Sequence, residues 1–336
     1  MNNNLNKTIF YNSTDSCFTV HGLPWTSIDQ PFCRLPQGVF VSKTVDFLKT
    51  HPSGAFLSFA TNSSFIRVEA NVSSKAYMSH MPATGILGCD LYIRKEKSWV
   101  FLGTTKIDSE SYELNIVEGM PQVMQEYRLY LPLYIGLTHL RVGIDSLSVI
   151  QKTEPVNPDK IVFYGTSITQ GGCASRPGMN GTSIIGRNVN YEIINLGFSG
   201  SAHLEQAMAN AIASLDNIKL LVVEAEANAG EILVLKDRLE SFIKTIANKQ
   251  KQMKVIVISH YPYALSTYKQ PMKMRFSDHF RFQKQLCLDN GWSFVSGKTV
   301  FKKLQYEETV DGVHLTDLGF YFLAQYLQKT IKKILG

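Results

Sequence analysis

A serine placed just after a short apolar run is the residue of this 336-residue chain best suited to covalent chemistry. The run Ile161–Tyr164 is typical of a buried strand, and it stops at a Gly-x-Ser turn that ends in Ser167. Open α/β sheets bind their ligands outside the carboxyl ends of their strands, so a hydroxyl at this turn is well placed for nucleophilic attack. A Gly-x-Ser turn is common, however, and alone it predicts only a turn or a helix cap.

An acid and an imidazole three positions apart, Asp311 and His314, precede the last predicted helix. An imidazole has an unperturbed pKa of about 6.5, so it can take a serine proton and later give it to a leaving group. A carboxylate on the same short turn can reach the far ring nitrogen and fix the tautomer. Together with Ser167, these residues predict a catalytic triad, although Asp-x-x-His alone is usually a surface turn.

Strands that alternate with helices must position these residues. Near-continuous apolar strands with helices between them predict a parallel sheet covered on both faces. In the last helix, Leu318, Phe322, Tyr326 and Ile331 lie close to one side, which indicates core packing. The predicted strands are Ile161–Tyr164, Glu192–Leu196, Leu220–Glu224, Val255–Ser259 and Trp292–Val295. The predicted helices are Leu204–Leu215, Ile232–Ala247, Phe276–Leu288 and Leu318–Ile334.

The first 150 residues have a different pattern, with short apolar and polar alternation broken by Gly, Pro, Asn and Ser. This pattern predicts an antiparallel β-sandwich or jelly roll. A single core rarely grows beyond roughly 250–300 residues, so we expect a sandwich domain at 1–150, a proline-containing linker at 151–159 and an α/β domain at 160–336. The predicted sandwich strands are Gly54–Ala60, Phe65–Ala70, Asp90–Ile93, Ser98–Leu102, Tyr127–Tyr130 and Leu140–Ile144.

Composition argues against several classes of protein. The net charge is +6, but the basic residues are scattered and form no stripe typical of nucleic-acid binding. The five cysteines are far apart and include no CxxC pair, which predicts reduced thiols and no metal site. No apolar run reaches the roughly 18 residues of a membrane span. Residues 1–7 are polar and lack the apolar core of a secretory signal, so we expect a cytoplasmic protein, or an exported one if a leader has been removed.

Four blocks in a fixed order carry a family resemblance, each at the end of a predicted strand or just before the last helix. They are Gly165–Ser167, Asn195–Gly200, Glu224–Asn228 and Asp311–His314. This order resembles the SGNH (GDSL-type) hydrolase superfamily. It is most similar to a bacterial branch in which that domain follows a β-sandwich. The segments His80–Gly85 and Glu126–Pro132 also resemble the sandwich domain of that branch.

The resemblance implies an ester hydrolase that works through an acyl-serine, without a metal or organic cofactor. It assigns the oxyanion hole to the backbone amides of Ser167 and Gly200 and the side-chain amide of Asn228. It also implies five parallel strands in the flavodoxin-like order 2-1-3-4-5. The expected substrate is a small-molecule or oligosaccharide ester, most simply a carbohydrate with a short acyl group such as acetyl; the oligomeric state stays open.

Alternatives remain open at this point. Within enzymes, the same fold suits an acyltransferase, a thioesterase or a lysophospholipase. A non-catalytic carbohydrate-binding protein with a degenerate hydrolase domain is the alternative from another class. The altered third block motivates it, since Glu224–Asn228 reads Glu-Ala-Glu-Ala-Asn where this branch commonly has Asp-Cys-x-Pro-Asn. A second departure, Thr166 where GDSL members carry aspartate, concerns the subfamily and not the nucleophile.

Four further residues are candidates for substrate binding. Arg176, in the loop after Ser167, could bind a sugar or carboxylate, or form a salt bridge within its loop. Glu226 and His260 follow strands and could line the pocket, or be a solvated loop carboxylate and a cap. His80 lies in a turn-rich segment that could lean over the cleft, or simply pack.

Aromatic residues and one thiol have less specific expectations. Trp25, Tyr77 and Trp99 could stack on sugar rings, or belong to the core. Cys173 lies six residues after Ser167 with no base of its own, which predicts a packing role.

Overall fold

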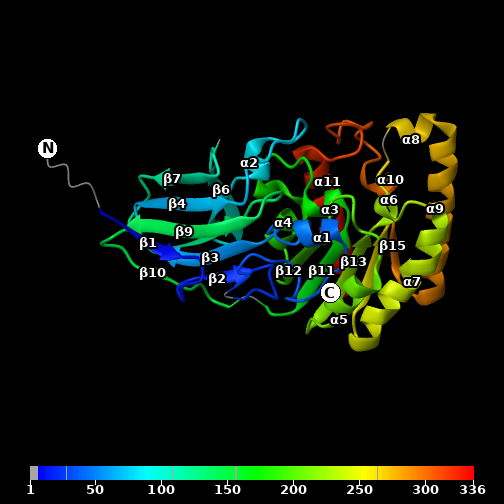
Figure 1. Ribbon diagram of the computed structural model, residues 1–336, viewed down its shortest axis with the longest axis horizontal. Helices are drawn as coiled ribbons and strands as arrows, with labels where there is room; N and C mark the ends of the chain where they lie inside the picture. Colours follow the sequence, from blue (N-terminus) through cyan, green and yellow to red (C-terminus); the bar gives the residue numbers. More distant parts are fainter. Residues whose placement is uncertain (1–6, 28, 108, 156, 263) are drawn as a thin grey trace.

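The computed structural model describes residues 7–27, 29–107, 109–155, 157–262 and 264–336. A β-rich half and an α/β half lie side by side along the longest axis (Figure 1). Among the described residues, none of the helices combines the length and apolar character that a membrane crossing requires. The expectation about a leader depends on residues 1–6, which lie outside the described part of the chain.

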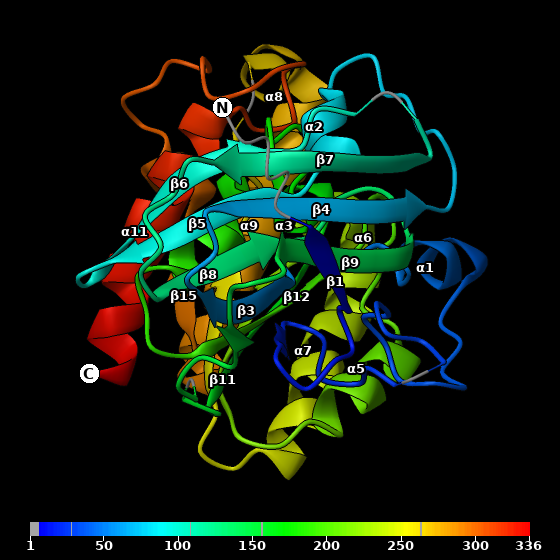
Figure 2. The same ribbon diagram turned by 90° about the vertical axis from the view of Figure 1, so that its left-hand side faces the viewer.

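The β-rich half contains two antiparallel sheets, which Figure 2 shows in front of the α/β half. One sheet has the order β1-β9-β4-β7; the other has the order β10-β3-β8-β5-β6, with β2 paired to β3. Inward-facing side chains of both sheets, such as Val68 and Phe59, share one core, so the predicted sandwich is confirmed, while the jelly-roll topology stays a prediction. The strands are β1 (Thr8–Asn12), β2 (Thr19–His21), β3 (Phe56–Thr61), β4 (Phe65–Val72), β5 (Asp90–Lys95), β6 (Ser98–Thr104), β7 (Ser111–Glu118), β8 (Gln125–Tyr130), β9 (Leu137–Asp145) and β10 (Ile150–Gln151).

The α/β half is built on a sheet of five parallel strands. Their order is β12-β11-β13-β14-β15, which is the predicted 2-1-3-4-5. Each strand lies within two residues of the predicted bounds. The strands are β11 (Lys160–Gly165), β12 (Glu192–Gly197), β13 (Ile218–Glu224), β14 (Lys254–Ile258) and β15 (Ser293–Val295).

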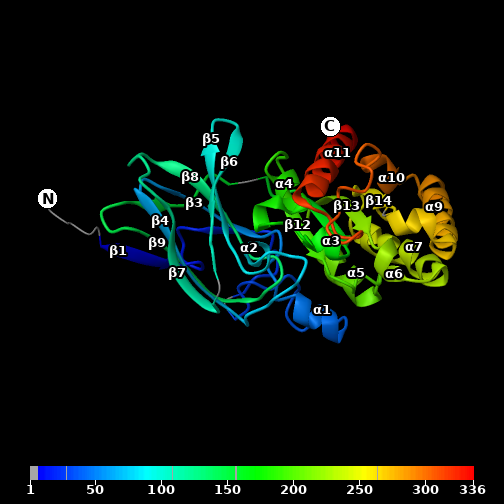
Figure 3. The ribbon, with the colours of Figure 1, turned by 90° about the horizontal axis from the view of Figure 1, so that it is seen from above.

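Helices cover both faces of this sheet, which makes three layers (Figure 3). In β11, Ile161 and Phe163 pack toward α4 and α11, while Val162 and Tyr164 pack toward α5, α7 and α9. The long helices are α5 (Gln206–Ala213), α7 (Ile232–Lys249), α9 (Gln270–Asn290) and α11 (Asp317–Leu335). The short ones are α1 (Lys43–Leu48), α2 (Ala83–Ile86), α3 (Ser167–Gln170), η1 (Pro177–Met179), α4 (Gly181–Gly186), α6 (Glu226–Ala229), α8 (Ala264–Tyr268) and α10 (Gly297–Val300).

The buried side of α11 agrees only in part with the predicted row. Ile331 is buried as predicted and Tyr326 is partly buried against the core, but Leu318 and Phe322 are exposed by 45% and 36%. The buried residues of the helix recur at intervals of three and four, which is typical of an amphipathic helix. They are Phe320, Leu323, Leu327 and Ile331. The helix contains apolar residues on more than one side, and periodicity alone could not choose between them.

The two halves share buried polar contacts as well as a common core. Arg34 is fully buried, and its guanidinium donates hydrogen bonds to the carbonyls of Asn195 (3.2 Å), Gly197 (2.6 Å) and Leu48 (2.9 Å). A buried guanidinium needs such partners, since leaving it unpaired would be costly. The sandwich half therefore fixes the carboxyl end of β12, from which the predicted oxyanion loop begins.

Candidate active site

Ser167 lies at a sharp turn between β11 and α3. Gly165 ends the strand, and a Cβ atom there would lie 2.7 Å from the carbonyl oxygen of Glu224 and 2.2 Å from Oγ1 of Thr169, so only glycine fits. Thr166 caps the helix, its hydroxyl accepting from the amide of Ile168 at 3.2 Å. The turn leaves Ser167 as the first residue of α3, 9% exposed at the carboxyl edge of the sheet.

The structure brings Ser167, His314 and Asp311 into one hydrogen-bonded chain. Nε2 of His314 lies 3.0 Å from Oγ of Ser167, and Nδ1 lies 2.8 Å from Oδ2 of Asp311. Oδ1 of Asp311 accepts from the amides of Val313 (3.0 Å) and His314 (2.8 Å). Burial opposes ionisation of Asp311, but the bonds from the His314 ring and these amides prevail and lower its pKa to about 2. Asp311 is therefore ionised throughout the neutral range.

The three predicted oxyanion donors lie on neighbouring loops. β12 and β13 flank β11, and their carboxyl ends lead to Gly200 and Asn228. Gly200 has a φ of +66°, and a Cβ there would meet no described atom within 4 Å, so the space beside its backbone is open. Oδ1 of Asn228 accepts from the amide of Ala202 at 3.2 Å, which orients the side chain and leaves its NH₂ group to donate elsewhere. The amide of Ser167 opens α3, where helix amides have no partner within the helix.

A buried carboxyl group supports the turn that presents Ser167, a role that the sequence did not reveal. Oε2 of Glu224 accepts from the amide and hydroxyl of Thr166 (3.2 and 2.8 Å) and from the hydroxyl of Thr169 (3.0 Å). The threonine at position 166 thus faces a carboxylate supplied by β13. Burial raises the pKa of Glu224 to about 7, against the opposing effect of these hydrogen bonds.

We predict that Glu224→Gln will flatten the pH dependence of stability. The pKa of Glu224 rises from an ordinary 4.5 to about 7 on folding, so its stabilising proton is fully present below pH 4.5 and is lost as the pH rises through 7. The free energy of unfolding of the wild type should therefore fall by about 2.5 kcal/mol between pH 5 and pH 8 because of this group. Urea unfolding of the variant should lack that loss, whereas Glu113→Gln, at an exposed position, should behave as wild type. The prediction is contradicted if the free energy of unfolding changes equally with pH in the wild type and in both variants.

The structure corrects the predicted pocket roles of Glu226 and His260. Both side chains are buried, and Glu226 accepts from the amide (2.8 Å) and Nδ1 (2.9 Å) of His260 and from Nε2 of Gln283 (2.6 Å). His279 lies 3.4 Å away. Burial opposes ionisation of Glu226, but the two histidines outweigh it and lower its pKa to about 2. These residues hold α6 and α9 together instead of facing a substrate. The sequence could not predict this role, because it does not show that both partners of the pair are buried.

Arg176 forms a structural ion pair, one of its two expected roles, but its partner lies in the sandwich and not in its own loop. Its Nη1 donates to the buried Oδ2 of Asp90 at 2.8 Å and to the hydroxyl of Tyr92 at 2.7 Å, and its guanidinium stacks 3.7 Å from the Phe101 ring centroid. The amide of Gly178 donates to the same Asp90 oxygen at 2.8 Å. Since Asp90, Tyr92 and Phe101 belong to the sandwich, this ion pair fixes the loop after Ser167 against the sandwich.

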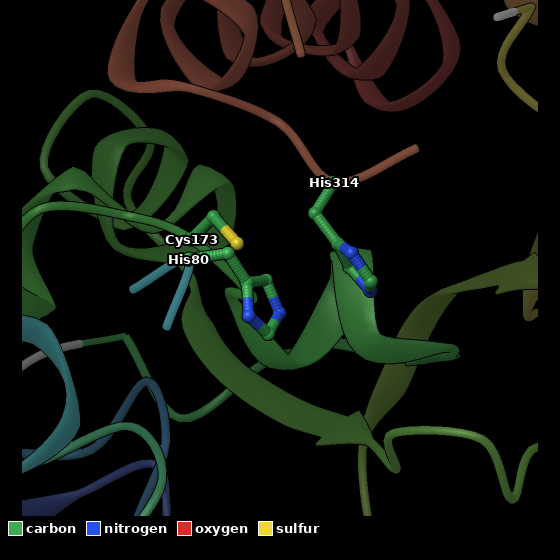
Figure 4. Close-up of side chains that lie close together, drawn as sticks. All are labelled: His80, Cys173 and His314. Carbon is green, nitrogen blue, oxygen red and sulfur yellow. The ribbon is translucent and has the colours of Figure 1, made fainter. Parts of the chain in front are cut away.

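The sandwich contributes His80 to the neighbourhood of the triad. The rings of His80 and His314 are 5.4 Å apart between centroids, and Figure 4 shows both beside Cys173. Burial, helped by the negative charge of Asp311, raises the pKa of Cys173 to about 12, so its thiol stays protonated and is no competing nucleophile. Tyr77, three residues before His80, is 86% exposed.

Trp25 and Trp99, the two tryptophans that could stack on sugar rings, lie in different surroundings. Trp25 is partly buried against the core on the α5 and α7 face. Trp99 lies 4.2 Å from the Arg128 guanidinium, measured to a ring centroid, and lines a cavity of about 530 Å³. Arg187 and Asn188 of the α/β half line the same cavity.

A parallel sheet with a Ser-His-Asp chain at its carboxyl edge is the arrangement of SGNH-type serine hydrolases. Residues 158–332 match the GDSL-like lipase/acylhydrolase family, and residues 8–150 match the family described as the N-terminus of Esterase_SGNH_hydro-type. The chain therefore belongs to the GDSL-like lipase/acylhydrolase family and is a serine ester hydrolase. A search of curated protein sequences found no match.

Solved structures with the same two-part architecture support this assignment. A Bacteroides ovatus protein assigned as a GDSL-like lipase has a TM-score of 0.90 and 28% identity, over 98% of each chain. The salicylyl-acyltransferase SsfX3 from a tetracycline biosynthetic pathway has a TM-score of 0.79 and 18% identity, over 97% of each chain. A family two carbohydrate esterase from Cellvibrio japonicus has a TM-score of 0.62 and 11% identity, over 98% of each chain. The last two show the fold alone.

Proposed function

We propose that Ser167 is the nucleophile of this esterase, His314 its general base and acid, and Asp311 the group that orients the imidazole. The observation that carries the proposal is the pair of hydrogen bonds that join the three side chains, at 3.0 and 2.8 Å. An Asp311 carboxylate on Nδ1 keeps the ring proton there, which leaves the lone pair of Nε2 to accept the serine proton.

The reaction then proceeds in two halves. Oγ of Ser167 forms a bond to the acyl carbon as its proton passes to Nε2 of His314, and the amides of Ser167, Gly200 and Asn228 stabilise the oxyanion. Collapse breaks the ester C–O bond, and the imidazolium protonates the departing alcohol. Water repeats the sequence on the acyl-serine, which releases the carboxylic acid and restores the hydroxyl.

We further propose that the acyl group is short. The floor beside Ser167 is closely packed: a Cβ atom at Gly172 would lie 2.8 Å from the Tyr134 hydroxyl, 3.1 Å from the Ser167 carbonyl oxygen and 3.2 Å from Cδ2 of His314. Tyr134 is buried and donates to that carbonyl at 3.2 Å. Such packing leaves little depth for a long chain and favours acetyl.

The alcohol part of the substrate is proposed to be a carbohydrate. Tyr77 is exposed and lies three residues before His80 in the segment that the sandwich supplies to the site, and an exposed aromatic face in that segment suits a sugar ring. The likeness of fold to the Cellvibrio japonicus carbohydrate esterase supports the same class of substrate.

Two linked measurements test the proposal. On nitrophenyl esters of increasing chain length we expect the maximum kcat/KM at acetate, and acetate release from a panel of acetylated oligosaccharides should exceed that from simple alkyl acetates. A maximum at eight or more carbons would replace the short-acyl proposal with a lysophospholipase or thioesterase. If an added sugar acceptor takes the acyl group in preference to water, the enzyme is an acyltransferase, the alternative that the likeness to SsfX3 supports.

A further inference from the structure

Three soft or borderline metal ligands converge beside the proposed triad. His80, Cys173 and His314 each offer one ligand atom, and these atoms all lie within 4.8 Å of one another. They come from three separate segments: the loop before α2, the loop after α3 and the segment before α11 (Figure 4). We infer that they form an inhibitory zinc site in which the metal takes the catalytic imidazole as one of its ligands.

The ligand set suits zinc in type and number. Thiolate and imidazole together favour Zn²⁺ over the hard cations, and three protein ligands leave a fourth tetrahedral position for water. Zinc ligands stand about 3.3–3.7 Å apart at ordinary Zn–S and Zn–N distances, so a movement of about 1 Å would complete the site. His80 is only half-buried, on a loop, and its ring can make that adjustment.

The backbone already directs the thiol toward this position. Cys173 has a φ of +74°, in the left-handed region that residues with a side chain rarely adopt. Such an outlier persists only where its surroundings hold it, and it is more frequent at functional sites than elsewhere. Here the loop is held by Thr84, whose hydroxyl donates to the carbonyl of Ser175 at 2.6 Å. Thr84 is also close in sequence to His80, so one contact fixes both ligand segments.

Asp311 provides the outer partner that zinc-bound histidines usually have. Its Oδ2 lies 2.8 Å from Nδ1 of His314, which leaves Nε2 as the ring nitrogen free to bind the metal. Binding of Zn²⁺ to Sγ of Cys173 releases the thiol proton to solvent, and its bond to Nε2 of His314 uses the lone pair that would otherwise accept the proton of Ser167. Zinc and catalysis therefore exclude one another. The inhibition rests on the proposed function, whereas the metal site does not.

The site is tested first without reference to catalysis. The wild-type protein is titrated with Co²⁺, a spectroscopic substitute for Zn²⁺, and a cysteinate-to-cobalt charge-transfer band should appear in the near ultraviolet. The band should disappear in Cys173→Ser and weaken in His80→Ala, while Zn²⁺ should displace the cobalt. Cys17→Ser and His139→Gln, which change the same residue types elsewhere, serve as matched controls and should keep the band. Absence of the band from the wild type, or its survival in Cys173→Ser, would overturn the site.

The second test measures ester hydrolysis against free Zn²⁺, each variant being compared with its own metal-free rate. The wild type should lose activity and recover it on addition of a chelator. Cys173→Ser and His80→Ala should each need at least about tenfold more zinc for half-maximal inhibition. Even the loss of a residue that only hydrogen-bonds to a metal ligand lowers metal affinity by about 10–100-fold. Equal zinc sensitivity in these variants and the controls would refute the inference even if the esterase reaction is confirmed. A cobalt band in a protein without esterase activity would leave the site standing and reject the proposed function.

Discussion

Ser167→Ala should lower kcat for ester hydrolysis by about 10⁴ to 10⁶-fold, the range seen when the nucleophile of a triad is removed. The change deletes one hydroxyl, whose proton passes to His314 in the proposed reaction. Alanine cannot form the acyl-enzyme, so only the oxyanion donors and substrate binding would contribute to the residual rate. Stopped assays of nitrophenyl acetate hydrolysis measure the loss, and labelling by a fluorophosphonate reports the nucleophile directly.

Ser183→Ala is the matched control for this variant. Ser183 is also buried on the α/β half, and its Oγ has no hydrogen-bond partner among the residues that the structure describes. Its removal should leave both the rate and the labelling unchanged. Labelling that persists in Ser167→Ala would assign the nucleophile to another residue, and a wild type that is never labelled would favour the carbohydrate-binding alternative.

The sheet could be predicted from the sequence because its strands are nearly continuous apolar runs. Such runs are buried on both faces, and the segments between them have helical periodicity. The four blocks that could carry chemistry each follow one of these runs or precede the last helix. Once the order of strands is known, the carboxyl edge must hold Ser167, Gly200 and Asn228 together. The position of His314 relative to Ser167 followed from the family resemblance, since a single sequence gives no distance in space between two residues that are 147 positions apart.

The surroundings of the site could not be predicted, for a physical reason that Arg176 and Glu226 illustrate. A place near substrate was one of two expectations for each, since Glu226 follows a strand end, where binding residues gather, and Arg176 lies in the loop after Ser167. Whether a charged side chain at such a place faces solvent or a buried partner depends on residues far away in the chain: Asp90 of the sandwich for Arg176, and Gln283 of α9 for Glu226. Local pattern carries no information about these partners.

The threonine at the second position of the nucleophile turn is explained by the same kind of distant contact. GDSL-type members carry aspartate there, so Thr166 departs from the pattern of that subfamily. Glu224 supplies a buried carboxyl group to the hydroxyl and amide of Thr166 from the neighbouring strand. The two departures from the family pattern therefore compensate each other at one contact, and the turn that presents Ser167 is retained.

Asp311→Asn should lower kcat at neutral pH by about 10⁴-fold without a comparable change in KM. The reason lies in the two backbone amides, of Val313 and His314, that donate to Oδ1. They hold the carbonyl oxygen of the new amide at that position, so its NH₂ group must face Nδ1 of His314. The ring then carries its proton on Nε2, which becomes a donor toward Ser167 and can no longer accept the serine proton.

This loss is distinguished from simple destabilisation by its control and by its readout. Asp278→Asn, at an exposed position on α9, should leave kcat unchanged, and both variants should unfold at nearly the wild-type temperature. NMR of the His314 ring protons should show the tautomer moved from Nδ1–H to Nε2–H in Asp311→Asn alone. If kcat falls by less than about tenfold although the tautomer has moved, the tautomer that Asp311 sets has no kinetic consequence, and the proposed role of His314 as the base for Ser167 is wrong.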